Sequence, residues 1–126
     1  MTAHPAVDLD HLARYSGGDA ALEAEVFALF RQQVQMWIRL LQPGADAESW
    51  ASAAHALKGS ARSIGAAALA SACEAAETVR AAGPAQRAIA AEEVRRCADA
   101  AIHFLDKHTY KARLAGLRSS SQRDNS

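Results

Sequence analysis

Apolar residues recur at intervals of three and four along most of the chain, which is the spacing of one face of an α-helix. The clearest apolar stripe alternates steps of four and three, and consists of Trp50, Ala54, Leu57, Ala61 and Ile64. The same spacing predicts long helices at about 20–42, 47–64, 66–82 and 84–114. Asp8 is placed to cap a shorter helix that ends near residue 15. No segment shows the apolar–polar alternation of a β-strand.

Glycine, proline and capping residues separate the helical segments. The turn and cap positions are Gly17-Gly18, Asp19, Pro43-Gly44, Gly65 and Gly83-Pro84. Four long helices joined by short turns predict an all-α fold, an antiparallel up-down-up-down four-helix bundle with a short N-terminal capping helix. We expect a flexible N-terminus at 1–7, the bundle domain at 8–117 and a disordered polar tail at 118–126.

The composition narrows the function classes. The chain has 126 residues, of which 50% are hydrophobic, enough for one domain with one core. Its 14 lysines and arginines balance 14 aspartates and glutamates, so no basic surplus points to nucleic acid. No apolar run predicts a membrane span, and the start lacks a secretory signal pattern, so we expect a cytoplasmic protein. Cys73 and Cys97 lie on apolar faces, which favours buried reduced thiols over a redox pair.

The candidate chemistry lies around His55. This residue follows the stripe residue Ala54 by one position, about 100° around the helix, so it faces away from the core. Lys58, Gly59 and Arg62 follow it at i+3, i+4 and i+7 on the same face. A neutral imidazole nitrogen is a competent nucleophile near neutral pH, and a phosphoryl group on it would bring negative charge that lysine and arginine can offset. A glycine inside a helix costs about 1 kcal/mol relative to alanine, and it clears space beside the imidazole.

Each of these residues also has an ordinary interpretation. A single histidine on an alanine-rich helix is usually a surface residue, and a lysine there is usually solvated. A glycine in a helix often marks close helix packing. The combined pattern of His55, Lys58, Gly59 and Ser60, set behind an intact inward stripe, favours a phosphoryl-carrying histidine.

The segment from His55 to Glu77 resembles the signature of histidine-containing phosphotransfer (HPt) domains. The matching positions are His55, Lys58, Gly59, Ser60, Ile64-Gly65, Leu69, Cys73 and Glu77. The stretch 9–30, with its Gly17-Gly18-Asp19 turn, resembles the opening of the same family. The resemblance covers roughly residues 8–110.

The resemblance implies a phosphorelay protein. His55 would shuttle a phosphoryl group between aspartates of receiver domains, from a hybrid sensor histidine kinase to a response regulator. Glu77 would orient the imidazole, and Lys58 and Gly59 would support and expose it. Candidate partner contacts are Ser60, Arg62, Arg80, Leu12, Tyr15 and Phe27, although simple core packing explains the last three equally well. The family implies a monomer without cofactor or metal, with Mg²⁺ on the partner receiver domain.

Three alternatives were weighed against this interpretation. A sensor kinase fragment or a dimeric phosphotransferase would need a nucleotide-binding domain or its relic, with glycine-rich phosphate loops. The scattered glycines do not form such loops, so no autonomous kinase activity is expected. A metal site is disfavoured, because His103 and His108 are five residues apart and no paired-cysteine or HExxH motif occurs. An interaction scaffold that has lost the phosphoacceptor role remains open.

Overall fold

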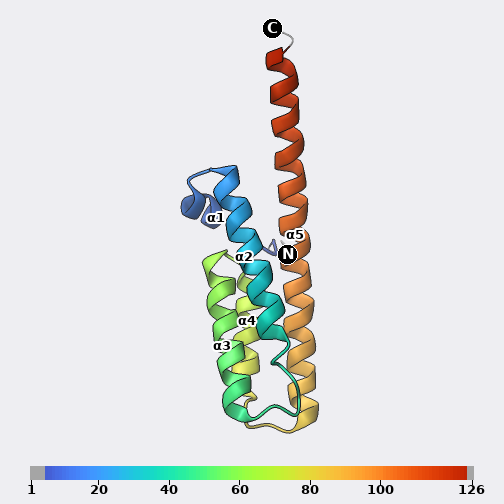
Figure 1. Ribbon diagram of the computed structural model, residues 1–126. Helices are drawn as coiled ribbons and strands as arrows, with labels where there is room; N and C mark the ends of the chain where they lie inside the picture. Colours follow the sequence, from blue (N-terminus) through green and yellow to red (C-terminus); the bar gives the residue numbers. More distant parts are fainter. Residues whose placement is uncertain (1–4, 125–126) are drawn as a thin grey trace.

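The computed structural model describes residues 5–124, and all of their side chains except those of Tyr15 and residues 118–124. Five α-helices make up the fold, and no strand occurs among the described residues (Figure 1). They are α1 (Leu9–Ser16), α2 (Ala20–Ile38), α3 (Ala47–Ser63), α4 (Ala67–Thr78) and α5 (Pro84–Asp124). The predicted all-α class is confirmed.

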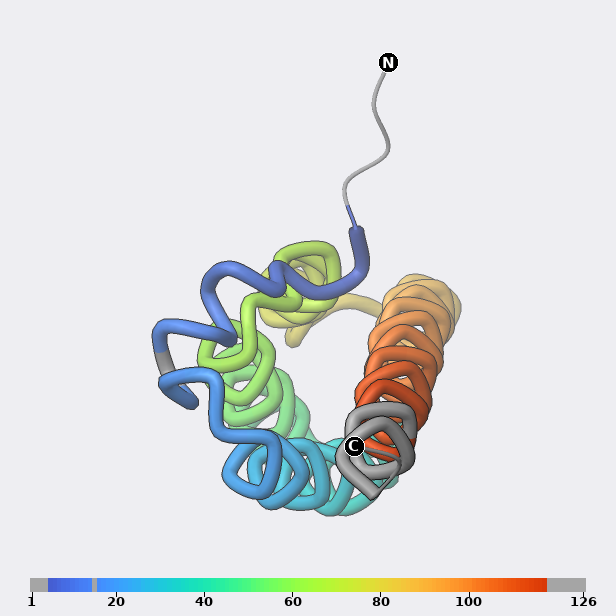
Figure 2. Tube along the Cα trace, turned by 90° about the horizontal axis from the view of Figure 1, so that it is seen from above, coloured from blue at the N-terminus to red at the C-terminus, as the bar shows by residue number. Residues whose placement is uncertain are grey.

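The four long helices form an antiparallel bundle. Figure 2 shows them as a ring in the order α2, α3, α4 and α5, so that each packs against two neighbours. Helices α3 and α5 stand diagonally across the ring and are not direct neighbours, although the Arg87 guanidinium of α5 lies over the Trp50 ring of α3. The short α1 lies over one end of the bundle. This arrangement confirms the predicted four-helix bundle with its capping helix.

The predicted apolar stripe of α3 fills the centre of the bundle. Trp50, Ala54, Leu57, Ala61 and Ile64 are all buried. The Trp50 indole N–H donates a hydrogen bond of 2.7 Å to the carbonyl of Ala76 on α4, which satisfies the indole's only polar group. A full stripe of buried residues fixes how α3 is rotated, and therefore which α3 residues reach solvent.

The chain turns at the positions that the sequence indicates. The Asp8 and Asp19 carboxylates accept hydrogen bonds from backbone amides in the first turns of α1 and α2, as predicted. Gly65 adopts the left-handed conformation, with φ of 78°. Its carbonyl accepts a hydrogen bond of 3.0 Å from the Asp8 amide, which ties the start of α1 to the α3–α4 turn.

The ends of the chain differ from the prediction. Val7 is fully buried, so the N-terminal flexible segment does not extend through residue 7; residues 1–4 lie outside the described part. Helix α5 continues to Asp124, where a disordered tail was expected from residue 118; residues 125–126 are again outside. Once a helix exists, each added residue gains a hydrogen bond at small cost, and the tail contains no proline to stop it.

The sequence pattern also predicted the ends of two internal helices too far along the chain. α2 ends at Ile38 and α4 at Thr78, each four residues before the predicted end. After Ile38 the chain leaves the helix and brings Leu41 into the core, where it is fully buried. No described helix has the length and hydropathy that crossing a membrane would require.

Candidate functional site

His55 and Glu77 meet across the groove between α3 and α4. Each follows a fully buried alanine by one position, Ala54 on α3 and Ala76 on α4, so both side chains leave the core toward the shared groove. The His55 Nδ1 atom lies 3.5 Å from Glu77 Oε1. The His55 side chain is 74% exposed, whereas that of Glu77 is 26% exposed. One nitrogen of the imidazole therefore faces the carboxylate, and the rest of the ring is largely open to solvent.

Lys58 binds the same carboxylate oxygen. Its Nζ atom lies 2.9 Å from Glu77 Oε1, and its side chain is only 13% exposed. The contact is close but not aligned as a hydrogen bond, and Oε1 has no hydrogen-bond donor among the described residues, so we treat it as an ion pair. The Lys58 ammonium lowers the pKa of Glu77 below its ordinary value, partial burial opposes this, and His55 adds to the lowering. Glu77 is thus a carboxylate at neutral pH.

The Glu77 carboxylate indicates which nitrogen of the His55 imidazole carries the proton. An ionised Glu77 accepts hydrogen bonds only, so the nitrogen that faces it is best occupied by an N–H. We assign the proton of neutral His55 to Nδ1 on this basis. The lone pair is then on Nε2, the ring nitrogen that does not face Glu77.

Gly59 has no packing role inside the described chain. It is exposed on α3, and an added Cβ would meet no atom within 4 Å. The interpretation that it marks close helix packing is therefore wrong. A helical glycine that the fold does not need leaves open space one turn after His55.

The predicted partner contacts lie in different environments. Arg62 and Arg80 are exposed and form no ion pair with any described residue. The Ser60 hydroxyl donates a hydrogen bond of 2.7 Å to Gln33 Oε1 on α2, so it ties α3 to α2. Leu12 and Phe27 are 1% and 8% exposed, which supports their core interpretation over a docking surface. The side chain of Tyr15 lies outside the described part.

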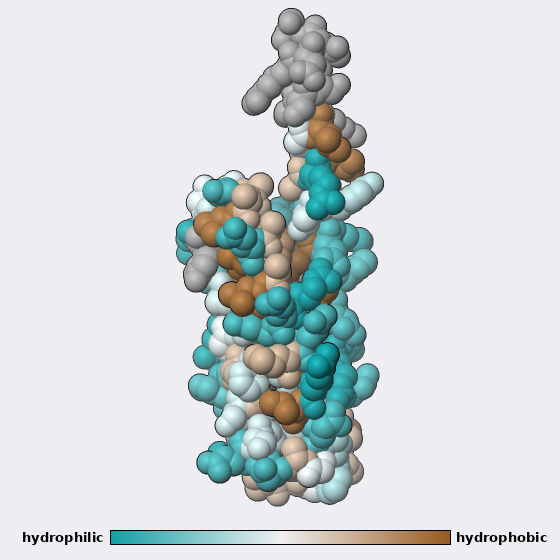
Figure 3. All heavy atoms as spheres, viewed as in Figure 1, coloured by the Kyte–Doolittle hydropathy of each residue, from teal (hydrophilic) through white to brown (hydrophobic). Residues whose placement is uncertain are grey.

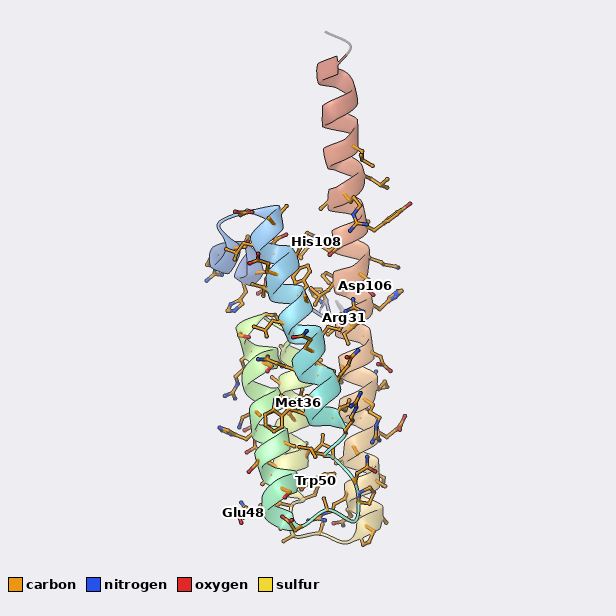
Figure 4. All side chains as sticks on the ribbon, viewed as in Figure 1. Arg31, Met36, Glu48, Trp50, Asp106 and His108 are labelled. Atoms are coloured by element: carbon orange, nitrogen blue, oxygen red, sulfur yellow. The ribbon has the colours of Figure 1, made fainter. Side chains whose placement is uncertain are left out.

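A row of exposed apolar side chains along α2 was not predicted from the sequence. It consists of Leu22, Leu29 and Met36 on α2, together with Leu40 in the turn that follows. The Gln33–Ser60 hydrogen bond sets the antiparallel register, so Met36 stands level with the α3 turn that carries His55. Figure 4 shows Met36 on α2 beside α3. The seven-residue spacing of Leu22, Leu29 and Met36 is the signal that could have identified it.

No group of three or more histidine, cysteine or acidic side chains within the described residues is arranged to hold a metal ion. The two cysteines, Cys73 and Cys97, are both buried and free, as predicted. Burial raises the pKa of the Cys73 thiol to about 12, with smaller contributions in the same direction from Cys97 and Glu77. Such a thiol is protonated and unreactive at neutral pH.

Comparison with known proteins agrees with this helical bundle. The sequence model of the Hpt domain family matches residues 18–107. Among solved structures, the chain resembles the histidine phosphotransferase ShpA from Caulobacter crescentus, with 34% identity and a TM-score of 0.71 over 89% of this chain and 98% of that one. No match was found among curated protein sequences. The chain belongs to the Hpt domain family. It is a phosphotransfer protein of two-component signalling.

Proposed function

We propose that His55 is the phosphoacceptor and that it carries a phosphoryl group between aspartates of receiver domains, from a hybrid sensor histidine kinase to a response regulator. One observation supports this most directly. The imidazole is 74% exposed while its Nδ1 atom faces the Glu77 carboxylate, which leaves Nε2 as the free nucleophile.

The transfer needs no general base on this chain. The Nε2 lone pair attacks the phosphorus of an aspartyl phosphate, the bond from phosphorus to the aspartate oxygen breaks, and its electron pair leaves with the carboxylate. The ring keeps its Nδ1 proton, so the phosphorylated imidazole carries a positive charge opposite Glu77. In the second transfer an aspartate oxygen of another receiver attacks the phosphorus, and the electron pair of the N–P bond returns to Nε2.

Glu77 and Lys58 act as a pair in this scheme. Glu77 orients the ring and stabilises the charged intermediate, because a carboxylate facing an imidazolium is a favourable contact. Lys58 holds Glu77 in place and partly neutralises it. Lys58 therefore contacts the Glu77 carboxylate directly. Its positive charge acts on the phosphoryl group through the Lys58–Glu77 ion pair.

The receiver domain would dock over α2 and α3. The exposed row of Leu22, Leu29, Met36 and Leu40 offers an apolar contact beside the His55 turn. The open space at Gly59 admits a bulky partner, and the exposed Arg62 lies about two helical turns from His55, where it can face the partner's carboxylates. In this proposal the Mg²⁺ belongs to the receiver domain, and the chain itself carries no cofactor.

The test follows the phosphoryl group. A phosphorylated receiver domain is mixed with the protein, and the label on each chain is measured over time. His55→Gln should abolish transfer, whereas His103→Gln, which changes an exposed histidine of α5, should transfer like the unmodified protein. Transfer that survives His55→Gln, or is lost only in His103→Gln, would refute the assignment. Labelled ATP without any partner should leave the chain unlabelled.

A further inference from the structure

The outer face of α5 carries a long stripe of exposed side chains. It runs through Ile89, Glu92, Arg96, Asp99, His103, Tyr110, Leu114 and Leu117, which follow one another at steps of three, four and seven. Ile89 is 71% exposed, and Tyr110 and Leu117 are each 63% exposed. Such spacing is that of a seam between two packed helices. The apolar side chains of the stripe lie at its two ends, Ile89 at one and Tyr110, Leu114 and Leu117 at the other, and the middle is charged or polar.

The helix also extends beyond the bundle that it helps to build. Figure 1 shows the C-terminal turns of α5 rising past the ends of the other helices. Figure 3 shows hydrophobic surface on this extension. The apolar residues on the described part of the extension are Leu114 and Leu117, and neither is in the core. Against the described residues, Leu114 is 38% exposed and Leu117 is 63% exposed.

Charge is divided between the two halves of the stripe. The exposed charges of the N-terminal half are Glu92, Glu93 and Asp99 against Arg96, a net negative set. The C-terminal half carries Lys107, Lys111 and Arg113 against Asp106, which is already paired with Arg31 of α2 (Figure 4). The face is therefore acidic toward one end and basic toward the other.

We propose that this face binds a second copy of the chain, with the two α5 helices antiparallel and the two-fold axis at His103. Positions equally far from residue 103 then stand side by side. Ile89 and Leu117, 14 residues to either side, bring the two most exposed apolar ends together. Asp99 and Lys107, four residues to either side, bring opposite charges together. The extension of each copy packs against the first turns of the other copy's α5.

The same stripe fits other occupants less well. In a parallel pair, the acidic half of one α5 stripe would face the acidic half of the other, and the basic half would face the basic half. Like charges repel, so this pairing is unfavourable. An anionic lipid surface would attract the basic half but repel Glu92 and Asp99. Only an antiparallel second copy uses both ends of the stripe. The proposal departs from the monomer that the family resemblance implies.

The pairing leaves the phosphotransfer site open. α5 stands diagonally across the bundle from α3, which carries His55, so the dimer would present two such sites on its outer sides. The proposal does not depend on the role of His55. Two helices in contact bury less than the roughly 800 Å² per partner of stable complexes, so we expect a weak dimer, with Kd on the order of 100 µM.

A charge swap tests the pairing. Sedimentation velocity of the full chain, from about 10 µM to about 1 mM, should show a monomer–dimer equilibrium that weakens as salt rises. Asp99→Lys and Lys107→Asp should each raise Kd, by roughly threefold to tenfold, because each opposes like charges at two symmetric contacts. The double variant should restore the original Kd. A monomer at 1 mM, or a double variant no tighter than the single ones, would overturn the proposal.

Cross-linking tests the direction of the pair. Thiol oxidation should join His103→Cys to itself across the two-fold axis, and should join Leu117→Cys to Ile89→Cys in a mixed sample. The native Cys73 and Cys97 are buried and do not interfere. Self-joining of Leu117→Cys without the mixed product would show a parallel pair and refute the geometry. Monomeric binding to vesicles of anionic phospholipid, lost in Leu117→Asp, would identify a membrane surface instead.

Discussion

At the scale of single residues, the two glycines of the signature segment are present for different reasons. Gly65 has φ of 78°, and an added Cβ would lie 3.1 Å from Asp8 Cβ. Both the backbone conformation and the packing of the chain therefore require it. Gly59 meets neither requirement, because it is helical and its added Cβ would touch nothing. The reason for Gly59 must come from outside the chain.

The variant Gly59→Ala separates stability from function. Alanine is favoured over glycine inside a helix, so urea unfolding should show a gain of about 0.5–1 kcal/mol in stability. Phosphotransfer to and from a receiver should become slower, and Gly59→Leu should slow it further, because each added group intrudes on the docking partner. Stopped-flow or quench-flow transfer rates measure the effect.

The control for this pair is Gly116→Ala, another helical glycine whose added Cβ meets no atom within 4 Å. It lies on the α5 extension, away from α3, and should leave transfer rates unchanged. If Gly59→Leu folds and transfers at the normal rate, docking does not need the clearance, and the argument from this glycine is wrong.

Glu77 gives a prediction on pH. Its pKa is lowered in the folded protein, chiefly by Lys58, so its contribution to stability is present above the ordinary carboxyl pKa and is lost as pH falls through the lower folded value. Glu77→Gln should therefore be less stable than the unmodified protein at pH 7, by about 0.5–1 kcal/mol, and the gap should narrow at acid pH, below the ordinary carboxyl pKa. Urea unfolding at both pH values measures it. Glu74→Gln, an exposed α4 neighbour, should show no such closing gap, and a constant gap for Glu77→Gln would contradict the ion pair.

The sequence predicts His55 better than it predicts the surroundings of His55. His55 follows Ala54, a buried residue of a clear apolar stripe. This position alone is enough to place the imidazole at the surface. The contact of Lys58 with Glu77 is different, because it joins two helices. Spacing within one helix places Lys58 beside His55 but does not reveal that a carboxylate on α4 holds its ammonium.

At the scale of the elements, Arg87 ties together the two loops that follow α2 and α4. This residue of α5 is only 8% exposed. One guanidinium nitrogen donates to the carbonyls of Pro43 and Ala45, at 3.1 and 2.5 Å, and another donates to the carbonyl of Arg80. Pro43, Ala45 and Arg80 lie in the loops that follow α2 and α4, so the Arg87 guanidinium joins these two loops and satisfies three of their carbonyls.

The starts of the helices and the ends of α1 and α3 were predicted within one residue, whereas the ends of α2 and α4 were predicted four residues too late. A helix start is marked by a local cap, as at Asp8 and Asp19, which acts within a few residues of itself. The loops after α2 and α4 are held by Arg87, which lies 44 residues from Pro43 in the chain. A long-range contact of this kind leaves no periodic pattern in the sequence.

Arg87→Ala should cost about 3 kcal/mol of stability, because three carbonyl contacts are lost together with the packing of the guanidinium over the Trp50 ring. Arg87→Lys should recover less than half of it, since one ammonium cannot reproduce the planar fork. Urea unfolding measures both. Arg96→Ala, on the exposed side of α5, serves as the control and should lie within about 0.5 kcal/mol of the unmodified protein. Equal stability of Arg87→Lys and the unmodified protein would show that the charge alone suffices.

At the scale of the whole molecule, the two candidate binding surfaces lie on opposite sides of the bundle. The candidate phosphotransfer site and the apolar row on α2 lie on one side, around α3. The charged stripe of α5 lies diagonally opposite. The core between them holds both cysteines, so any reagent that reaches a thiol must first open the bundle.

Cys73 therefore reports global unfolding. Its thiol is fully buried and its pKa is raised to about 12, chiefly by burial, so roughly one molecule in ten thousand carries the thiolate at pH 8. In a Cys97→Ala background, an aromatic disulfide reagent should label Cys73 only when the protein opens. The labelling rate should then fall below that of the urea-unfolded chain by the unfolding equilibrium constant measured independently. Ser52→Cys, at an exposed α3 position, should react at the rate of a free thiol in the same protein. Rapid labelling of Cys73 in a fully folded sample would mean that α3, α4 and α5 separate locally, and that the bundle opens without unfolding as a whole.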